Sequence, residues 1–458
     1  MEFFVILGQL FISSPIGIMM QTLLIRLPQQ IEMRLRAIYN SENNEIFFMH
    51  IYLVGGAVRD KLLDYPSSEN DWVVVGATPE QMVDLGFTPV GKDFPVFIHN
   101  KSGEEYALAR TERKSGRGYQ GFEFYTSSEI TLEQDLARRD LTINAMAMDA
   151  DGTLIDPYGG QRDLRSKVLR HVSDAFTEDP LRVLRVARFA ARYSHLGFTI
   201  DPETKQLMHS IVAAGEIEHL VAERVWKETN LALLERSPEV YLEVLRDCGA
   251  LEKILPEVDA LFGVPQRADY HPEIDTGKHV LLSLKQAVGL SDSGPVRFSV
   301  LVHDLGKAIT PPSVLPSHKG HEAGGLPLVK NVCDRLGVPN EYRQLAMAVT
   351  EFHLLCHKAL ELKPQTILKL LKGIGALRQS SRLRDFLYCC EADARGRTGF
   401  EERTYPSSDY LTKALERVSN TDISDLVEAG LEGAEIGRQL ELRQLATLTE
   451  HKQNYSAG

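Results

Sequence analysis

The stretch LVGGAVRD at Leu53–Asp60 decides the fold, and ENDW at Glu69–Trp72 follows it closely. The apolar residues 51–54 predict a strand, the glycine pair predicts a turn, and the residues after it predict a short helix that carries Arg59. A second strand is predicted over residues 71–75. Because glycine has no side chain, a phosphate can approach the backbone N–H groups of this turn closely. The positive end of the helix dipole points to the same place, so the stretch predicts a phosphate-binding turn.

Two carboxylates beside this turn indicate a metal. Glu69 and Asp71 are two residues apart, which places both side chains on one face of an extended strand. Magnesium prefers oxygen ligands and commonly keeps phosphate oxygens among them. A paired-metal site would hold two such ions about 3.5–4 Å apart and stabilise both the attacking and the leaving oxygen. The alternative is a tight turn and a solvated acidic loop, but the combination of strand, glycines, arginine and carboxylates favours a site for a nucleotide and a metal.

Length and composition limit the number of domains, the possible partners and the cellular compartment. The chain has 458 residues, enough for two to four domains with an ample core. Its formal net charge is −12, so any contact with RNA must come from a local basic patch. Five cysteines show no CxxC spacing. This pattern indicates a reducing compartment, here the cytoplasm, with neither a zinc site nor disulfides.

The first 48 residues differ in character from the rest of the chain. Residues 3–25 are apolar and carry no charge, a length that raises the question of a membrane span. The segment lacks a basic start and a small-residue cleavage site, so a secretory signal is not expected. Met49 is expected just before the first strand. We therefore interpret residues 1–48 as an N-terminal extension, with Met49 as the natural start and no membrane association.

Three further motifs lie in the first third of the chain. Residues 104–110 predict a strand in which Glu105 stands five residues before an arginine, residues 113–121 form a basic, glycine-rich loop, and residues 135–145 contain Arg-Arg-Asp. With the opening stretch, these motifs resemble the head domain of class II tRNA nucleotidyltransferases, the CCA-adding enzymes and their relatives. The family pattern has two aspartates where this chain has Glu69 and Asp71, a change that keeps the charge and adds one methylene.

The resemblance assigns roles to the residues of these motifs. Glu69 and Asp71 become the catalytic, magnesium-binding pair, and Glu105 is either a third carboxylate near the metals or an exposed strand residue. The loop at 113–121 either takes part in catalysis or is a solvated hairpin tip. The nucleotide-binding roles fall to Gly56, Arg59 and Arg139.

Arg139 would hold the triphosphate, because a guanidinium pairs bidentately with phosphate oxygens. Asp140 would orient arginines, and Asn144 would reach the ribose.

A helix with arginines at three- to four-residue spacing comes next in the chain. In residues 177–189, Thr177 is a plausible N-cap and Pro180 is tolerated in the first turn. Four arginines, at positions 182, 185, 188 and 192, form one basic face, while the apolar residues point into the core. The alternative is a salt-bridged surface helix, but the stretch matches the EDxxRxxR motif of the family.

That motif has a physical purpose. Cytosine and adenine both present an amino donor beside a ring-nitrogen acceptor, and guanine and uracil present the reverse. Asp179 would accept from the amino group and Arg182 would donate to the ring nitrogen. Three residues apart on a helix, the two side chains would lie side by side and select C and A without a template. Arg185 and Arg188 would hold the phosphates or shape this pocket.

Histidines concentrate in the second half of the chain. The string HDLGK at 303–307 follows an apolar run, and other histidines flank it on both sides. The adjacent pair resembles the centre of HD-superfamily phosphohydrolases. Imidazole and carboxylate ligands suit nickel, manganese or iron better than magnesium, and such a metal generates a hydroxide that attacks phosphate esters. The expected ligands are His279, His303, Asp304 and His321, with His353 as a further candidate, although scattered histidines are more often structural.

We therefore expect an α+β, multi-domain chain: an α/β head with a mixed sheet, a helical neck and an all-helical HD domain. The expected ranges are 1–48 for the extension, 49–190 for the head, 191–256 for the neck, 257–380 for the HD domain and 381–458 for a helical C-terminal region without a readable motif. The order of head and HD centre resembles the multifunctional, gamma-proteobacterial type of CCA-adding enzyme.

The resemblance implies addition and repair of the 3′-terminal CCA of tRNA from CTP and ATP, with release of pyrophosphate. It also implies an HD-dependent phosphatase, 2′-nucleotidase or 2′,3′-cyclic phosphodiesterase. Magnesium would serve the head, nickel or another transition metal would serve the HD centre, and the chain would be a monomer or homodimer. The alternatives are a poly(A) polymerase with the same head, an HD-dominated nucleotide hydrolase such as a guanosine tetraphosphate synthetase/hydrolase, and an RNA-binding protein without activity.

Overall fold

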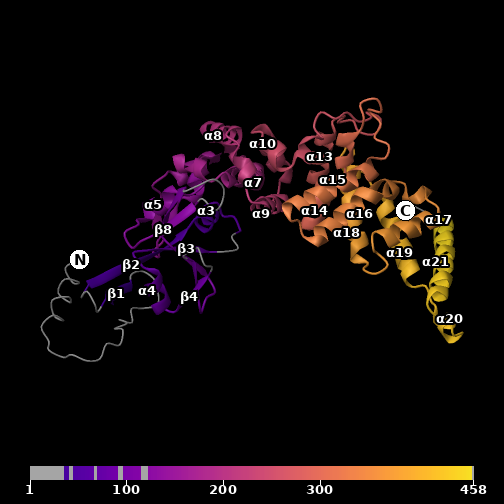
Figure 1. The fold of residues 1–458 in the computed structure, drawn as a ribbon, viewed down its shortest axis with the longest axis horizontal. Helices are drawn as coiled ribbons and strands as arrows, with labels where there is room; N and C mark the ends of the chain where they lie inside the picture. Colours follow the sequence, from indigo (N-terminus) through magenta and orange to yellow (C-terminus); the bar gives the residue numbers. More distant parts are fainter. Residues whose placement is uncertain (1–35, 41–44, 67–69, 91–95, 115–121, 456–458) are drawn as a thin grey trace.

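The computed structural model describes residues 36–40, 45–66, 70–90, 96–114 and 122–455. The molecule is elongated, with a sheet-containing head at one end, magenta helices in the middle and orange to yellow helices at the other end (Figure 1). This arrangement confirms the predicted α+β class and the helical second half.

A mixed sheet forms the centre of the head. Its strands run in the order β10 (Leu154–Ile155), β9 (Ala147–Met148), β2 (Glu45–Val54), β3 (Asp71–Val75), β6 (Glu105–Leu108), β5 (Val96–His99) and β4 (Phe87–Val90), and β1 (Arg36–Asn40) pairs with β2. Only the β3–β6 pair is parallel among the described strands of this sheet. The mixed sheet is therefore confirmed, and its parallel pair brings the starts of two strands together.

Both faces of this sheet are covered. Val74 packs into a core beside α4 (Pro79–Asp84), and Val73 packs into a second core beside α5 (Leu132–Ala137). Neighbouring residues of β3 enter different cores because side chains alternate across a strand. The short helix α3 (Gly56–Leu62) follows β2, as predicted. The remaining head elements are β7 (Arg110–Lys114), β8 (Phe122–Thr126), η2 (Thr142–Asn144), α6 (Gly160–Ser166), β11 (Val168–Leu169) and η3 (Asp174–Glu178).

The first strand begins earlier than predicted. β2 starts at Glu45 and pairs with β1, so Met49 lies inside this strand and not before it. Ile46, Phe47 and Phe48 are residue types that favour strands, which accounts for the earlier start. The apolar segment 3–25 lies outside the described residues. Among the described residues, no helix is long and apolar enough to cross a membrane.

Helices make up the rest of the chain. The middle of the molecule contains α7 (Leu181–Tyr193), η4 (Ser194–Leu196), β12 (Thr199–Ile200), α8 (Pro202–Ala213), η5 (Glu216–His219), α9 (Ala222–Leu233), α10 (Pro238–Asp247), α11 (Ala250–Ile254) and α12 (Pro256–Asp259). The far end contains α13 (Thr276–Leu290), α14 (Gly294–Val302), η6 (Leu305–Ile309), α15 (His321–Leu336), α16 (Asn340–His357), η7 (Ala359–Glu361), α17 (Pro364–Gly373), α18 (Ser381–Arg395), α19 (Pro406–Ser419), α20 (Ser424–Glu428) and α21 (Ala434–Asn454). One contiguous apolar core extends from Val58 in α3 to Leu448 in α21.

Candidate active sites

The glycine turn of the head lies beside two predicted site residues, Asp71 and Arg139. Gly55 has a backbone φ of +67°, a conformation that residues with a Cβ atom rarely adopt. A Cβ at this position would lie 2.8 Å from Nη1 of Arg139 and 3.9 Å from Oδ2 of Asp71. The turn is therefore a close approach between backbone, guanidinium and carboxylate, as a phosphate-binding site requires. Glu69 lies outside the described residues.

Asp71 has a carboxylate neighbour on the next strand. The parallel register pairs Asp71 with Glu105, and both residues are exposed. Residues paired in this way project to the same side of a sheet, about 4.8 Å apart. Two carboxylates on adjacent strands are a donor set that suits magnesium. The register was not predictable from the sequence, which placed Glu105 near the metals only through the family resemblance.

Arg59 faces the interior of the molecule. Its Nε donates to Oδ1 of Asp60 over 2.8 Å, and its guanidinium lies over the rings of Phe189 and Tyr193 on α7. Tyr193 also donates a hydrogen bond to Asp60. Arg59 and Asp60 therefore attach the glycine-turn helix α3 to α7. The nucleotide-binding role of Arg59 stays a prediction, as does that of Gly56, whose added Cβ would lie 3.3 Å from Nη2 of Arg59.

A buried aspartate positions the two arginines of the Arg-Arg-Asp motif. Asp135 is fully buried and accepts from Arg138 over 2.7 Å and from Arg139 over 3.1 Å. Burial alone would raise the pKa of Asp135, but the charges of Arg139 and Arg138 lower it below its usual value. Asp135 therefore stays ionised and holds Arg139 beside Gly55.

The third residue of that motif, Asp140, contacts α7. Its carboxylate accepts from Nε of Arg185 over 2.7 Å and from the side-chain amide of Asn144 over 2.9 Å. Burial alone would raise the pKa of Asp140, but Arg185 holds it well below its usual range. Asn144 accepts in turn from Arg59, so its amide is engaged within the protein.

The arginines of α7 are paired within the protein. Arg188 donates to Glu228 of α9 over 2.7 Å, and Arg185 lies 3.7 Å from the other oxygen of the same carboxylate. A continuous polar network therefore links the head to α9. Leu184 and Ala187 are fully buried on the other side of α7, as predicted.

The predicted base-reading pair does not share a helix turn. α7 begins at Leu181 with Pro180 as its N-cap, and Asp179 precedes it in an extended conformation. Thr177 lies in the preceding η3 and is not the N-cap. The reason is the proline, which disfavours helical geometry in the residue before it.

Both members of the pair have partners in the protein. Asp179 accepts from the backbone N–H of Leu181 over 3.0 Å and from Arg224 of α9 over 2.8 Å. Arg182 is buried and donates to the carbonyl oxygens of Ala175 and Arg138. The base-reading role of both residues stays a prediction.

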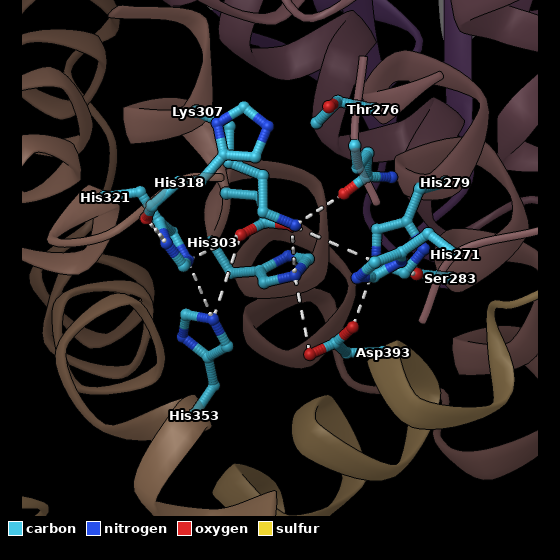
Figure 2. Close-up of polar contacts among 12 residues, drawn as sticks. His271, Thr276, His279, Ser283, His303, Lys307, His318, His321, His353 and Asp393 are labelled. Atoms are coloured by element: carbon cyan, nitrogen blue, oxygen red, sulfur yellow. Dashed lines mark hydrogen bonds and ion pairs between the residues drawn. The ribbon is translucent and has the colours of Figure 1, made fainter. Parts of the chain in front are cut away.

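The four predicted ligands of the HD centre meet in one buried cluster, together with His353 of α16 and Asp393 of α18 (Figure 2). His279 Nε2 lies 2.9 Å from Oδ1 of Asp393, and His303 Nε2 lies 3.3 Å from Oδ2 of Asp304. Four helices, α13, α15, α16 and α18, and the junction between α14 and η6 supply these groups. His271 and Glu273 lie beside His279 at the edge of the cluster.

Backbone carbonyls fix how the histidines are protonated. The Nδ1 atoms of His303, His321 and His353 each lie 2.7–3.0 Å from a main-chain oxygen. A carbonyl only accepts, so each Nδ1 carries a hydrogen and each Nε2 points inward. This is the usual outer-shell arrangement of metal-binding imidazoles.

The inward nitrogens need a cation. Nε2 of His321 and Nε2 of His353 face each other over 3.3 Å, and two neutral rings would oppose their lone pairs there. Within the described residues, Nε2 of His303 is a buried atom without a hydrogen-bond partner, and Oδ1 of Asp304 lies 3.1 Å from Nε2 of His321. A proton or a metal ion between these groups resolves both problems. Burial alone would lower the pKa of His303, but Asp304 raises it to about 9, whereas burial lowers the pKa of His353 to about 3.

Asp393 and Glu273 belong to the cluster but were not predicted from the sequence. Asp393 lies in the range expected to have no motif, yet it occupies a core position of α18, in line with Leu383, Phe386 and Cys390. The sequence signal for Asp393 was a carboxylate at a helix position where the spacing of the pattern predicts an apolar residue. Oε1 of Glu273 lies 3.0 Å from Nδ1 of His279, and nothing in the sequence around Glu273 marks it as a site residue.

Comparison with known proteins agrees with the class of protein that this architecture defines, a nucleotidyltransferase head on a helical body. Residues 51–170 match the family described as "Poly A polymerase head domain", and residues 197–262 match "Probable RNA and SrmB- binding site of polymerase A".

Whole-chain relatives are more specific. A "Multifunctional CCA protein" of Teredinibacter turnerae is 57% identical over 392 residues, which is 86% of this chain and 95% of the relative. One of Acinetobacter baumannii is 56% identical over 409 residues, 89% of this chain and 99% of the relative. The chain belongs to the family of multifunctional CCA proteins. A solved structure titled "Thermotoga maritima CCA-adding enzyme complexed with tRNA_CCA" has the same fold, with a TM-score of 0.58, 20% identity, and coverage of 90% of this chain and 89% of that one.

Proposed function

We propose that the head adds the 3′-terminal CCA to tRNA from CTP and ATP, with release of pyrophosphate. The observation that carries the proposal is the pairing of Asp71 with Glu105 beside the Gly55 turn, where Arg139 lies against the backbone. Membership in the family of multifunctional CCA proteins supports it. The transfer forms a bond between the tRNA 3′-oxygen and the α-phosphorus, and the bond from that phosphorus to pyrophosphate breaks.

Asp71 and Glu105 would hold magnesium, with Glu69 as the further carboxylate expected from the sequence. When bound, magnesium lowers the charge of the triphosphate and stabilises the attacking and leaving oxygens. Arg139, fixed by Asp135, would bind the triphosphate, since its Nε is buried without a hydrogen-bond partner in the described residues. Asp179 and Arg182 would read the base, and the partners of the chain would be tRNA, CTP and ATP.

The direct test is incubation with tRNA that lacks its 3′ end, with each nucleoside triphosphate alone and in pairs. We expect two C residues from CTP alone, and a complete CCA end only with CTP and ATP together. A long A tract from ATP alone would instead identify a poly(A) polymerase, which has the same class of head. No incorporation with any triphosphate would refute the proposal.

We also propose a second activity, metal-dependent hydrolysis of phosphate esters at the HD centre. The facing Nε2 atoms of His321 and His353, with Oδ1 of Asp304 only 3.1 Å from the Nε2 of His321, support a bound transition metal. Such a metal supplies a hydroxide near neutral pH. His279, His303, Asp304, His321, His353 and Asp393 would hold it. Hydrolysis adds water across a P–O bond, and the ribose oxygen leaves with the proton.

Substrates for this test are a 2′-nucleotide and a 2′,3′-cyclic nucleotide, assayed with nickel, manganese and magnesium in turn. We expect hydrolysis with nickel or manganese and little with magnesium, because imidazoles prefer the softer ions. Metal content of the dialysed protein, measured separately, should show one transition-metal site that His303→Ala removes. A protein that binds no transition metal would refute the assignment.

A further inference from the structure

Arg397, the arginine that follows α18, lies beside Asp393 of the HD centre. Nη2 of Arg397 is 3.8 Å from Oδ1 of Asp393, beyond the 2.7–3.2 Å range of hydrogen bonds. Within the described residues, its Nε is buried and has no acceptor. The side chain as a whole is 19% exposed, so one part of it still reaches solvent.

The neighbouring backbone fixes the place of this arginine. The carbonyl of Gly396 accepts from Nδ1 of His279 over 3.1 Å, and the N–H of Thr398 lies 3.4 Å from a carboxylate oxygen of Glu273. A Cβ at Gly396 would lie 2.5 Å from the Cα of Ser283 on α13, so only glycine allows this approach. The segment 396–398 therefore packs against the residues of the HD centre, and this packing fixes Arg397 beside the centre.

Asp393 does not need this guanidinium. Its oxygens already lie 2.9 Å from Nε2 of His279 and 2.7 Å from Nε2 of His357. A guanidinium that contributes no hydrogen bond to its nearest carboxylate, yet is partly buried beside a cluster of metal ligands, has its donors available to something else. The planar fork of arginine matches two oxygens of a phosphate.

We infer that Arg397 is a substrate-binding residue of the HD centre, which holds the non-bridging oxygens of the phosphate that is hydrolysed. The inference rests on the proposed phosphohydrolase activity and names its substrate group: a terminal phosphate or cyclic phosphate on a ribose. Arg397 contacts the substrate and does not contribute a ligand to the metal.

The test compares Arg397→Met with Arg397→Lys and with the control Arg403→Met. Arg403 is an exposed arginine of the same loop that lies over the ring of Phe400. Loss of hydrogen bonds between charged groups predicts a rise of about ten- to hundredfold in KM for a 2′-nucleotide in Arg397→Met. Arg397→Lys keeps the charge and loses the fork, so its KM should rise less. The control variant should match the wild type.

Two binding measurements distinguish a loss of phosphate binding from a loss of metal binding in Arg397→Met. The Kd of inorganic phosphate for the manganese-loaded protein should rise by a similar factor in Arg397→Met, while the Kd of manganese itself stays unchanged. An unchanged phosphate Kd overturns the inference. A parallel loss of manganese affinity also overturns it, because Arg397 would then act through Asp393. If Arg397→Met does not fold, the same readings on Arg397→Lys decide. If the wild type hydrolyses nothing, the proposed activity fails, while phosphate binding still tests the role of Arg397.

Discussion

Replacing Asp179 with alanine tests how the head selects its nucleotide. The change removes the carboxylate that would accept from the amino group of cytosine or adenine, and it leaves Arg182 in place. We expect CTP and ATP incorporation to fall, and the preference for these nucleotides over UTP and GTP to relax. Uracil and guanine present a carbonyl where the other bases present an amine, so only the preferred pair loses a contact.

The structure sets the size of both effects. The lost carboxylate also accepts from the N–H of Leu181, a helix-cap interaction worth about 1 kcal/mol. Its partner Arg224 is 26% exposed and stays hydrated when this carboxylate is lost, so the total loss of stability should be about 1–2 kcal/mol. That leaves a chain of ordinary stability folded. A hydrogen bond to a charged group is worth about 1.5–3 kcal/mol, which is roughly a ten- to hundredfold change in discrimination.

The assay measures kcat/KM for all four nucleoside triphosphates on a tRNA that lacks its 3′ end. Arg224→Met is the informative companion, because it frees the carboxylate without removing it and should relax the preference to a smaller extent. Asp174→Ala, an exposed carboxylate five residues upstream, is the matched control. An Asp179→Ala enzyme that is slower yet retains its full preference for C and A would show that the base is read elsewhere.

Three other outcomes are expected from the contacts. Asp71→Ala should abolish nucleotide addition and leave phosphate-ester hydrolysis intact, whereas Asp84→Ala, an exposed carboxylate on α4, should alter neither activity; addition above a few per cent would exclude Asp71 from the metal site. His303→Ala should remove hydrolysis and transition-metal binding and spare nucleotide addition; if all three stay unchanged, the histidine cluster is structural. Asp140→Asn should lower the free energy of unfolding at pH 7 by less than the roughly 3–5 kcal/mol of a fully buried pair, because the side chain of Arg185 is 35% exposed. The folded-state pKa of Asp140 lies below its usual value, so its contribution is complete above about pH 5 and is lost as the pH falls below about 4. In urea unfolding the difference from the wild type should therefore shrink in acid, and a constant difference would contradict the pairing.

Most of the secondary structure of the head could be predicted from local sequence patterns. The strand, glycine turn, short helix and second strand are set by neighbouring residues, and the second strand begins at Asp71 as predicted. The prediction that Asp179 lies within the helix was wrong. The sequence carried the signal, because Pro180 disfavours helical geometry in the residue before it. The sequence could mark Asp393 as a carboxylate at a core position of its helix but could not give its partner, since Asp393 meets His303 only after α18 packs beside α13 and α14. The internal partners of Arg59 and Arg185 likewise depend on long-range contacts.

The apolar core that extends from Val58 in α3 to Leu448 in α21 determines how the chain responds to damage. Phe352 of α16 is buried in that core, and truncating a buried phenylalanine costs about 3–5 kcal/mol. A loss of that size lowers the amount of folded chain in a cell several-fold. A lesion in the helical half would then reduce nucleotide addition without touching the head. In a cell such an allele would mimic a defect in the head, and only the specific activity of the purified protein would tell a scarce enzyme from an impaired one.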